Sequence, residues 1–460
     1  MRSLRGILLF FSLVLSFNAV AQEQGSGIVF KNGDRVCFVG NSITANGQFC
    51  NFISLYYAAR FPNENVRFFN CGISGNSATG VIRRMEYDIL VHQPTWSVVM
   101  LGMNDVNRGL YAPNSDTIRG IKEKRQAALD NYKEKLELII NALLKHNSKV
   151  ILQKPSIYDQ TGSLRSVNHV GVNDALAMCC KYIDELAVKY GLPVVDYWTI
   201  LNKVNQVIQK DDSTATIIGP DRIHPRVPGH FVMAYQFLRS TLAPGPVSRI
   251  EVNARSLNMN ADNCEIRDFQ KKKDRFLFLC RQNSIPFPVK DEAMPALAYV
   301  PFTDEYDRQL LRVQGARKGN YDLLIDHVSV GRFTSDELAK GINLVLLKQS
   351  PQYKQSEDLL SLFDQYLKTE REIRSLRLVE FDFLGGKAPA GLDSIKIFLD
   401  DLLVSRYAQS QYRDYYKSQF DHYIEFKSKE GSLQDTLAKT YEKFYEKKPA
   451  FHLFEIVKIK

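Results

Sequence analysis

The sequence lacks an apolar run as long as the roughly 20 residues that a membrane-spanning helix needs. The apolar stretch from Ile7 to Phe17 follows two arginines and precedes Ala19-Val20-Ala21, which is the pattern of a cleavable secretory signal. No cysteine directly follows the expected cleavage site for lipid attachment. We therefore expect residues 1–21 to be a signal peptide and the mature protein to be periplasmic or secreted, without stable membrane insertion. An uncleaved anchor is the alternative.

Clusters of cysteine and histidine at metal-ligand spacing are also missing. Cys264 and Cys280 are close enough in sequence for a disulfide in an exported protein, but the sequence alone leaves the pairing open. Cys37 and Cys71 lie in or beside apolar runs, where a buried thiol is the simpler interpretation. The count of seven is odd, so at least one cysteine is unpaired unless it bonds another chain. We expect no metal and no other cofactor.

Charge of one sign does not dominate the chain. The formal net charge is +9, of which two positive charges belong to the expected signal peptide. Basic clusters such as Lys271-Lys272-Lys273 are short and accompany no nucleic-acid motif, so they are better explained as a solvated face than as a polyanion groove. With 45% hydrophobic and 24% charged residues, the chain is typical of globular proteins and long enough for two domains. The sequence does not indicate the oligomeric state.

Apolar runs alternate with segments of helical period between residue 35 and about residue 243. The expected strands are Arg35–Val39, Val66–Asn70, Ser97–Leu101, Val150–Gln153 and Pro193–Tyr197. The expected helices are Phe49–Arg60, Thr117–His146, Asn173–Tyr190, Thr199–Ile208 and Pro228–Leu242. Strands that are apolar throughout must be covered on both faces. Residues 22–243 are therefore predicted to form a doubly wound α/β domain with a flavodoxin-like, parallel sheet of five strands.

The composition changes at Ala243-Pro244-Gly245-Pro246, which we take as a domain boundary. Residues 247–350 are predicted to be a β-rich accessory domain that includes a hairpin around Asp326-His327. Residues 351–460 are predicted to be helical and to pack on the rest of the chain. Within them, an aromatic stripe is better explained by packing than by a sugar-stacking platform; its members are Tyr412, Tyr416, Phe420 and Tyr423.

Three expected strands end in polar, turn-prone motifs. These are Gly40-Asn41-Ser42-Ile43-Thr44, Asn70-Cys71-Gly72-Ile73-Ser74-Gly75 and Gly102-Met103-Asn104-Asp105. The carboxyl ends of parallel strands meet at one edge of a sheet, which is where ligands bind in such folds. A hydroxyl, a backbone amide beside glycine and a side-chain amide would thus share one rim, as nucleophilic attack on an ester carbonyl requires.

A serine hydroxyl needs a neighbouring base to become a good nucleophile. The best base for Ser42 is His224, because Asp221 lies three residues before it and a turn could fold the carboxylate onto the imidazole. The oxyanion of the tetrahedral intermediate requires hydrogen-bond donors, for which the Ser42 and Gly72 amides and the Asn104 side chain are the candidates.

The four motifs, in this order, resemble those of the SGNH/GDSL hydrolases over roughly residues 33–242. The blocks that correspond are Gly-Asn-Ser around Ser42, the glycine block at Gly72, Gly-x-Asn-Asp at Asn104 and Asp-x-x-His at residues 221–224. The resemblance implies a carboxylic ester hydrolase with a Ser42–His224–Asp221 triad and an oxyanion hole of Ser42, Gly72 and Asn104. The region after Pro246 is similar to accessory regions of exported family members associated with polysaccharide breakdown.

One residue departs from the family pattern, which usually has aspartate where this chain has Asn41. An amide can still accept a hydrogen bond and shape the turn, but it brings no negative charge. We expect catalysis to be kept because the triad acid is Asp221. Asn76, Arg83 and Tyr158 lie near the expected rim and are candidates for contacts with substrate, although each has a simpler structural explanation.

These observations favour a serine esterase that hydrolyses O-acyl esters, most plausibly O-acetyl groups on a carbohydrate, through an acyl-enzyme intermediate. The substrate would be a small-molecule or polysaccharide ester, and no nucleic-acid partner is expected. A lipid acylhydrolase with the same triad is an alternative, but the sequence shows no apolar lid around the motifs. A non-catalytic carbohydrate-binding protein on the same fold is the other alternative, supported by Asn41.

Overall fold

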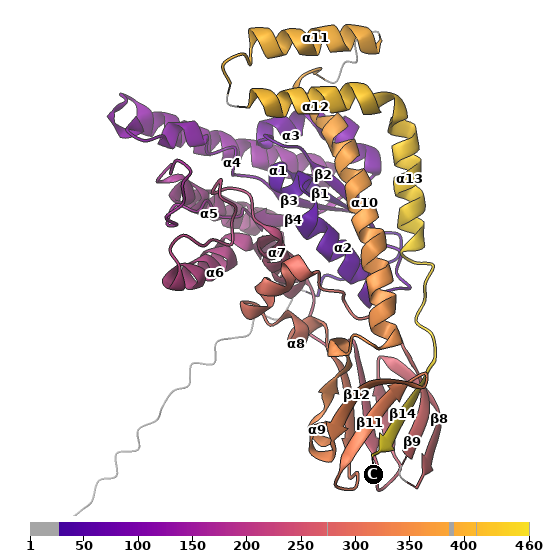
Figure 1. Ribbon diagram of the computed structural model, residues 1–460. Helices are drawn as coiled ribbons and strands as arrows, with labels where there is room; N and C mark the ends of the chain where they lie inside the picture. Colours follow the sequence, from indigo (N-terminus) through magenta and orange to yellow (C-terminus); the bar gives the residue numbers. More distant parts are fainter. Residues whose placement is uncertain (1–26, 274, 386–390, 411, 460) are drawn as a thin grey trace, which may run out of the picture.

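The computed structural model describes residues 27–273, 275–385, 391–410 and 412–459 (Figure 1). The expected signal peptide lies outside these residues. A five-stranded, all-parallel sheet has the strand order β2-β1-β3-β4-β5. Its strands are β1 (Arg35–Gly40), β2 (Arg67–Gly72), β3 (Trp96–Met100), β4 (Lys149–Lys154) and β5 (Val194–Asp196). This topology confirms the predicted doubly wound α/β fold class.

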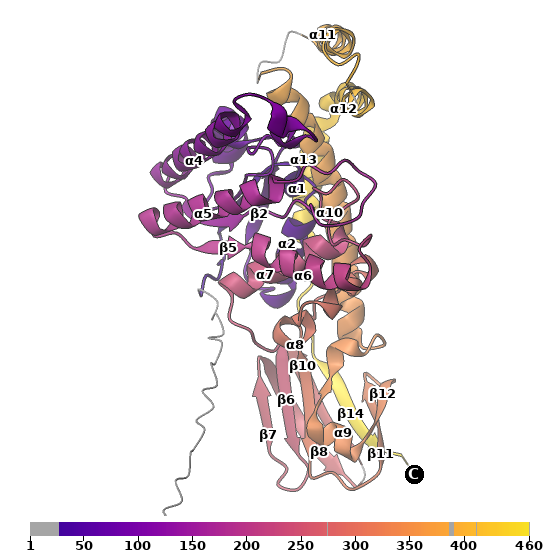
Figure 2. The same cartoon turned by 90° about the vertical axis from the view of Figure 1, so that its left-hand side faces the viewer.

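Helices cover both faces of this sheet, as strands that are apolar throughout require. One face is covered by α2 (Gln48–Arg60), α6 (Tyr197–Asp211) and α7 (Val227–Thr241), and the other by α3 (Ala78–Arg84), α4 (Ile121–Lys145) and α5 (Val172–Tyr190). An apolar core lies on each face of the sheet, and successive residues of β1 pack alternately into the two cores. Val36 and Phe38 belong to the core beneath α2, α6 and α7, and Cys37 and Val39 to the core beneath α3, α4 and α5. Figure 2 shows these helices as layers around the sheet.

Two further sheets pack face to face beyond this domain and share one core (Figure 2). The first has the strand order β13-β10-β6-β7, with bounds Ile342–Asn343, Gln309–Gln314, Ser248–Asn253 and Met259–Asp262. The second has the order β12-β11-β14-β9-β8, with bounds Val328–Thr334, Asn320–Ile325, His452–Lys458, Arg275–Gln282 and Cys264–Lys272. The hairpin at Asp326-His327 occurs where it was predicted, with both turn residues at positive φ. The short helix α9 (Ser335–Lys340) begins with the Thr334 capping box.

The C-terminal strand β14 corrects the prediction that residues 351–460 form only a helical region. This strand lies between β11 and β9, so the end of the chain returns to the β-rich region. A second difference concerns residues between β9 and β10. Ile285, Phe287 and Phe302 lie in the core of the α/β domain and not in that of the β-rich region. These long-range placements follow from packing and leave no local pattern in the sequence.

The long helix α10 (Pro351–Asp382) runs along the α/β domain from the β-rich region to the helices α11 (Leu392–Ser405) and α12 (Arg413–Phe426) (Figure 1). Helix α10 begins at a Ser350 cap whose hydroxyl accepts from the Tyr353 amide at 3.1 Å. Helix α13 (Glu430–Lys443) packs beside it. Of the aromatic stripe, Phe420 and Tyr423 are buried in a core with α10 and α11, whereas Tyr412 is half-exposed.

All seven cysteines are free thiols, including Cys264 and Cys280 on adjacent strands. None of the helices among the described residues is long and apolar enough to cross a membrane. Within the same residues, no group of three or more metal-ligating side chains is arranged to hold an ion.

Candidate active site

The turn after β1 places Ser42 at the first position of the short helix α1 (Ser42–Ala45). Asn41 is the N-cap, and its Oδ1 accepts a hydrogen bond from the Ile43 amide at 3.0 Å. The amide side chain thus performs the cap that an aspartate carboxylate would perform, which explains how the turn tolerates Asn41. Gly40 is required there, because a Cβ would lie 2.1 Å from the Thr44 hydroxyl oxygen.

The Ser42 hydroxyl lies beside an imidazole that comes from near the C-terminal end of the α/β domain in sequence. The distance from Ser42 Oγ to His224 Nε2 is 2.7 Å, and His224 Nδ1 is 2.5 Å from Asp221 Oδ2. Asp221 Oδ1 also accepts from the backbone amides of Ile223 at 3.0 Å and His224 at 3.1 Å. The structure therefore brings Ser42, His224 and Asp221 together as a continuous hydrogen-bonded chain.

Asp221 is electrostatically suited to orient the imidazole. Burial by itself would raise the pKa of the Asp221 carboxyl, but the hydrogen bonds from the His224 ring and from the two amides outweigh burial and lower it to about 2. The carboxylate is therefore ionised at neutral pH. Its side chain and that of His224 are 47% and 45% exposed, so substrate can reach them from solvent.

Arg222, between the two residues of this pair, was not singled out from the sequence. Its buried guanidinium donates to the carbonyls of Asp159 and Gly162 at 2.9 Å, and to those of Leu164 and Ser166 at 3.0 and 3.1 Å. Its backbone has φ +68°, a left-handed conformation that is uncommon for a residue with a side chain. Arg222 thus fastens the Asp221–His224 turn to the loop of residues 159–166.

Asn104 follows β3 on the same rim. Its Nδ2 donates one hydrogen bond to the Asn76 carbonyl at 2.9 Å, which leaves its second amide hydrogen for another acceptor. The neighbouring Asp105 is buried and shapes the loop by accepting from the amides of Gly102 at 2.9 Å and Ala78 at 2.7 Å. Burial raises the pKa of Asp105 to about 6 despite these hydrogen bonds.

The structure contradicts the prediction that Gly72 donates to an oxyanion. The Gly72 amide already donates to Asn70 Oδ1 at 3.0 Å, and the residue is packed so tightly that a Cβ would lie 2.2 Å from the Ala45 nitrogen. Gly75 is the better candidate. It is exposed in the turn closed by the Ile73–Asn76 hydrogen bond, has φ +80°, and among the described residues nothing accepts a hydrogen bond from its amide.

The three residues predicted to contact substrate have different environments in the structure. The Asn76 side chain is buried and occupied, because it donates to Asp382 of α10 and accepts from Arg84 at 2.8 Å. The Tyr158 hydroxyl is likewise occupied by the Val167 carbonyl at 3.3 Å and the His169 amide at 2.9 Å. Both are therefore structural, and their prediction as substrate contacts is wrong. Arg83 is exposed on α3, where a contact with substrate remains a prediction.

A groove of about 420 Å³ was not anticipated from the sequence. It is lined by residues next in the chain to the segments that carry the pair, because Pro225 follows His224 and Asn46 follows α1. Its lining combines polar and apolar side chains and comes from three segments; the residues are Asn46, Gln48, Pro225, Arg226, Val227, Pro228, His230 and Glu292. His230 is fully buried and stacks on Phe49, and burial, with a smaller effect of Arg371, lowers the pKa of its imidazole to about 3. Glu292 belongs to the residues after Pro246, on the turn of helix Asp291–Ala298.

The parallel sheet, the nucleophile turn after β1 and the Asp221–His224 turn before α7 define a serine-hydrolase type of site on an α/β fold. The family model of the GDSL-like lipase/acylhydrolases matches residues 38–231 of this chain. The chain belongs to this SGNH/GDSL family and is a carboxylic ester hydrolase, as its motifs predicted.

Two relatives differ in how much of the chain they share. The structure of a gut microbial diltiazem-metabolizing enzyme is 30% identical, with a TM-score of 0.82, and the match covers 95% of this chain and 100% of that one. An acetylxylan esterase from Geobacillus stearothermophilus is 25% identical over 226 residues, which are 45% of this chain and 94% of the relative. A solved structure of that esterase matches with a TM-score of 0.37. The first relative therefore shares the C-terminal region, and the second corresponds in length to the α/β domain.

Proposed function

We propose that this esterase removes O-acetyl groups from a carbohydrate through an acyl-enzyme intermediate on Ser42. The observation that carries the proposal is the chain of short hydrogen bonds from Ser42 Oγ through His224 to Asp221. A neutral imidazole with its Nδ1 hydrogen held by a carboxylate presents an unprotonated Nε2 to the serine hydroxyl. Ser42 is thereby equipped to lose its proton as it attacks the ester carbonyl.

In the first half-reaction, Ser42 Oγ bonds to the carbonyl carbon while its proton moves to His224 Nε2. The oxyanion would receive hydrogen bonds from the amides of Ser42 and Gly75 and from the free hydrogen of Asn104 Nδ2. Collapse of this intermediate breaks the bond to the alcohol oxygen, which takes the proton from His224. Water then repeats the sequence: His224 accepts its proton, the acetyl group leaves as acetate, and Ser42 regains its hydrogen.

Polar side chains in the groove support a carbohydrate as the alcohol part of the ester. Because His224 must protonate the departing alcohol oxygen, we expect that part of the substrate on the His224 side, and residues that directly follow His224 line the groove. The amides of Asn46 and Gln48 can donate to and accept from hydroxyl groups, the Arg226 guanidinium can donate, and the Glu292 carboxylate can accept. A lipid acylhydrolase would require an apolar channel instead. The 25% identical acetylxylan esterase supports the acetyl group.

Diltiazem is a second candidate substrate. The relative that is described as diltiazem-metabolizing matches 95% of this chain, including the C-terminal region, whereas the acetylxylan esterase matches 45%. Incubation of the purified protein with diltiazem, followed by chromatography of the remaining drug, tests this substrate. The Ser42→Ala variant is the control, since loss of drug by this site requires the serine.

The proposed function is tested by screening acetylated xylo-oligosaccharides and other acetylated polysaccharides for release of acetate. The wild-type protein should release acetate, and Ser42→Ala should lower kcat by about 10⁴ to 10⁶. A chain-length series of p-nitrophenyl esters should show activity that falls from acetate to octanoate. Equal activity of Ser42→Ala would refute the triad, and a preference for octanoate would favour the lipid acylhydrolase.

A further inference from the structure

Helix α10 lies outside the residues that the family model matches, yet it contacts the active-site rim at several points. Figure 1 shows it beside α2 and next to the edge of the sheet that carries β2. Three of its side chains within about one turn face this rim: Glu370, Arg371 and Arg374.

Arg374 holds the glycine-containing loop after β2. Its Nε donates to the Gly72 carbonyl at 2.9 Å, while Nη1 and Nη2 donate to the two carboxylate oxygens of Asp88 at 2.7 and 2.8 Å. Both side chains are buried. This fork is the geometry for which a guanidinium is suited and an ammonium is not.

Asp88 extends the network to the nucleophile turn. It also pairs with the buried Arg84, whose Nη2 donates to the Gly40 carbonyl at 3.1 Å, two residues before Ser42. Arg84 Nε donates to Asn76 Oδ1 at 2.8 Å, and the Asn76 carbonyl is the acceptor that holds Asn104. One buried set of charges thus connects α10 to the Ser42 turn and, through Asn76, to Asn104.

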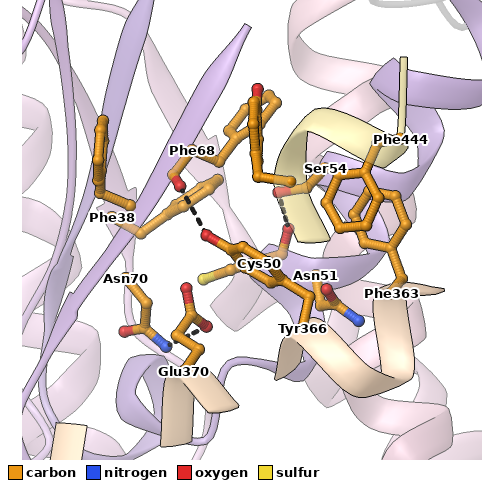
Figure 3. Close-up of a pocket in the computed structure, with 12 residues that line it drawn as sticks. Phe38, Cys50, Asn51, Ser54, Phe68, Asn70, Phe363, Tyr366, Glu370 and Phe444 are labelled. Carbon is orange, nitrogen blue, oxygen red and sulfur yellow. Dashed lines mark hydrogen bonds between the residues drawn. The ribbon is translucent and has the colours of Figure 1, made fainter. Parts of the chain in front are cut away.

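Arg371 holds the opposite end of α1, and Glu370 holds Asn70 of β2. Arg371 donates to the Asn46 carbonyl at 2.7 Å and to its side-chain oxygen at 3.1 Å, and Asn46 is the C-cap of the helix that begins with Ser42. Figure 3 shows Glu370 facing Asn70, whose Nδ2 donates to Glu370 Oε2 at 3.3 Å. Asn70 in turn accepts from the Gly72 amide, so α10 constrains both polar groups of that glycine.

We propose that α10 is part of the catalytic apparatus, with Arg374 and Arg371 as positioning residues that hold the Ser42 turn and the Gly72–Asn76 loop in register. The inference rests on the proposed function, because it concerns the same site. Displacement of a reacting group by about 1 Å can cost about 10² in rate, so groups that fix the backbone of these turns affect kcat without touching substrate.

The test compares Arg374→Ala with Arg377→Ala on p-nitrophenyl acetate. Arg377 lies one turn further along α10, and within the described part of the chain it forms ion pairs with Glu380 of the same helix and Glu430 of α13. We expect Arg374→Ala to lower kcat about 10- to 100-fold with KM changed less than about threefold. Arg377→Ala should lower Tm comparably while kcat stays within about twofold of wild type, because its ion pairs do not reach the rim. Both variants are assayed well below their Tm.

Two additions keep the test decisive if Arg374→Ala does not fold. Arg374→Lys retains the charge but cannot make the fork, and Arg371→Ala removes a partly exposed group; each should lower kcat about fivefold or more at unchanged KM. Wild-type kcat in both, or an equal loss of kcat in Arg377→Ala, would overturn the inference. Ser42→Ala is measured on the same substrate. Activity that survives Ser42→Ala refutes the proposed function, whereas Ser42-dependent activity that is indifferent to Arg374 and Arg371 refutes only the role of α10.

Discussion

In the proposed oxyanion hole, Asn104 would contribute one amide hydrogen, since its other one is bound by the Asn76 carbonyl. That bond fixes the orientation of the side-chain amide before substrate arrives, which is the condition for stabilising an oxyanion without reorganisation. The neighbouring Asp105 differs, because its carboxylate is already occupied by the backbone amides of Gly102 and Ala78.

Asn104→Ala should therefore lower kcat by about 10² to 10³, equivalent to about 2.7 to 4 kcal/mol in the barrier. KM for p-nitrophenyl acetate should change little, because the amide acts on the charge that develops in the transition state. Steady-state kinetics at fixed pH measures both constants. A loss of kcat smaller than tenfold would remove Asn104 from this role.

Arg222 combines a strained backbone with a buried guanidinium that serves four carbonyls. We expect Arg222→Ala and Arg222→Gly both to lower the free energy of unfolding by more than about 3 kcal/mol, because these carbonyls lose their donors. Arg222→Gly should be about 1 kcal/mol the more stable of the two, since glycine adopts φ +68° without strain. Urea unfolding measures the free energy of unfolding of both variants. If Arg222→Ala is the more stable of the two, the argument from backbone strain is contradicted.

At the scale of elements, the short helix at Asp291–Ala298 contributes Glu292 to the groove that Pro225 and Arg226 line. Ala293 and Ala296 anchor it in the core of the α/β domain, and this anchoring brings Glu292 to the groove. An element that follows the α/β domain in sequence thus supplies a polar side chain to the groove.

Glu292→Ala should raise KM for an acetylated xyloside about tenfold, because a carboxyl group that accepts from sugar hydroxyls is lost. The kcat/KM for p-nitrophenyl acetate should stay within about twofold, since its alcohol part has no sugar hydroxyls. The matched control is Asp291→Ala, which removes the adjacent exposed carboxylate outside the groove. Equal kinetics of Glu292→Ala and wild type on the xyloside would exclude Glu292 from the sugar site.

At the scale of the whole molecule, buried acids lie where the C-terminal elements meet the α/β domain. Glu370 of α10 is enclosed by residues of α2, β2 and α13 (Figure 3). Burial raises the pKa of the Glu370 carboxyl to about 7, although Asn70 donates to it. Asp307, whose Oδ1 accepts from the Phe287 amide, has its pKa raised to about 7 for the same reason.

Because the pKa values of Glu370 and Asp307 are raised, we expect the free energy of unfolding of this protein to depend on pH. Between the ordinary carboxyl value of 4.5 and about 7, the folded protein keeps a proton on Glu370 that the unfolded chain has released. The free energy of unfolding should therefore fall as pH rises through this interval and level off above it, with a contribution of at most about 3 kcal/mol from Glu370.

Glu370→Gln should remove this contribution. The unfolding free energy of the variant, relative to wild type, is expected to increase by up to about 3 kcal/mol between pH 5 and pH 8. Urea unfolding across this range measures the difference, with Glu372→Gln on the same helix as the control. A difference that does not change with pH would show that Glu370 does not titrate in this way.

The local part of this architecture could be predicted from the sequence. The five parallel strands and the helices that cover them are marked by apolar runs and helical periods. Strand β14 was missed because it follows a long helical stretch and its partners, β9 and β11, lie more than a hundred residues earlier. No pattern within the strand itself identifies those partners.

Sequence alone determined which residue types stand at the ends of the strands, and hence the family and the candidate pair of Ser42 and His224. Those features depend on neighbours in the chain, such as the Asn41 cap and the three-residue spacing of Asp221 and His224. Only the tertiary structure decided that the Gly72 amide is occupied and that Gly75 is exposed, that Asn76 and Tyr158 are structural, and that α10 holds the rim. Which donor meets which acceptor across hundreds of residues depends on packing, and packing is a property of the folded chain as a whole.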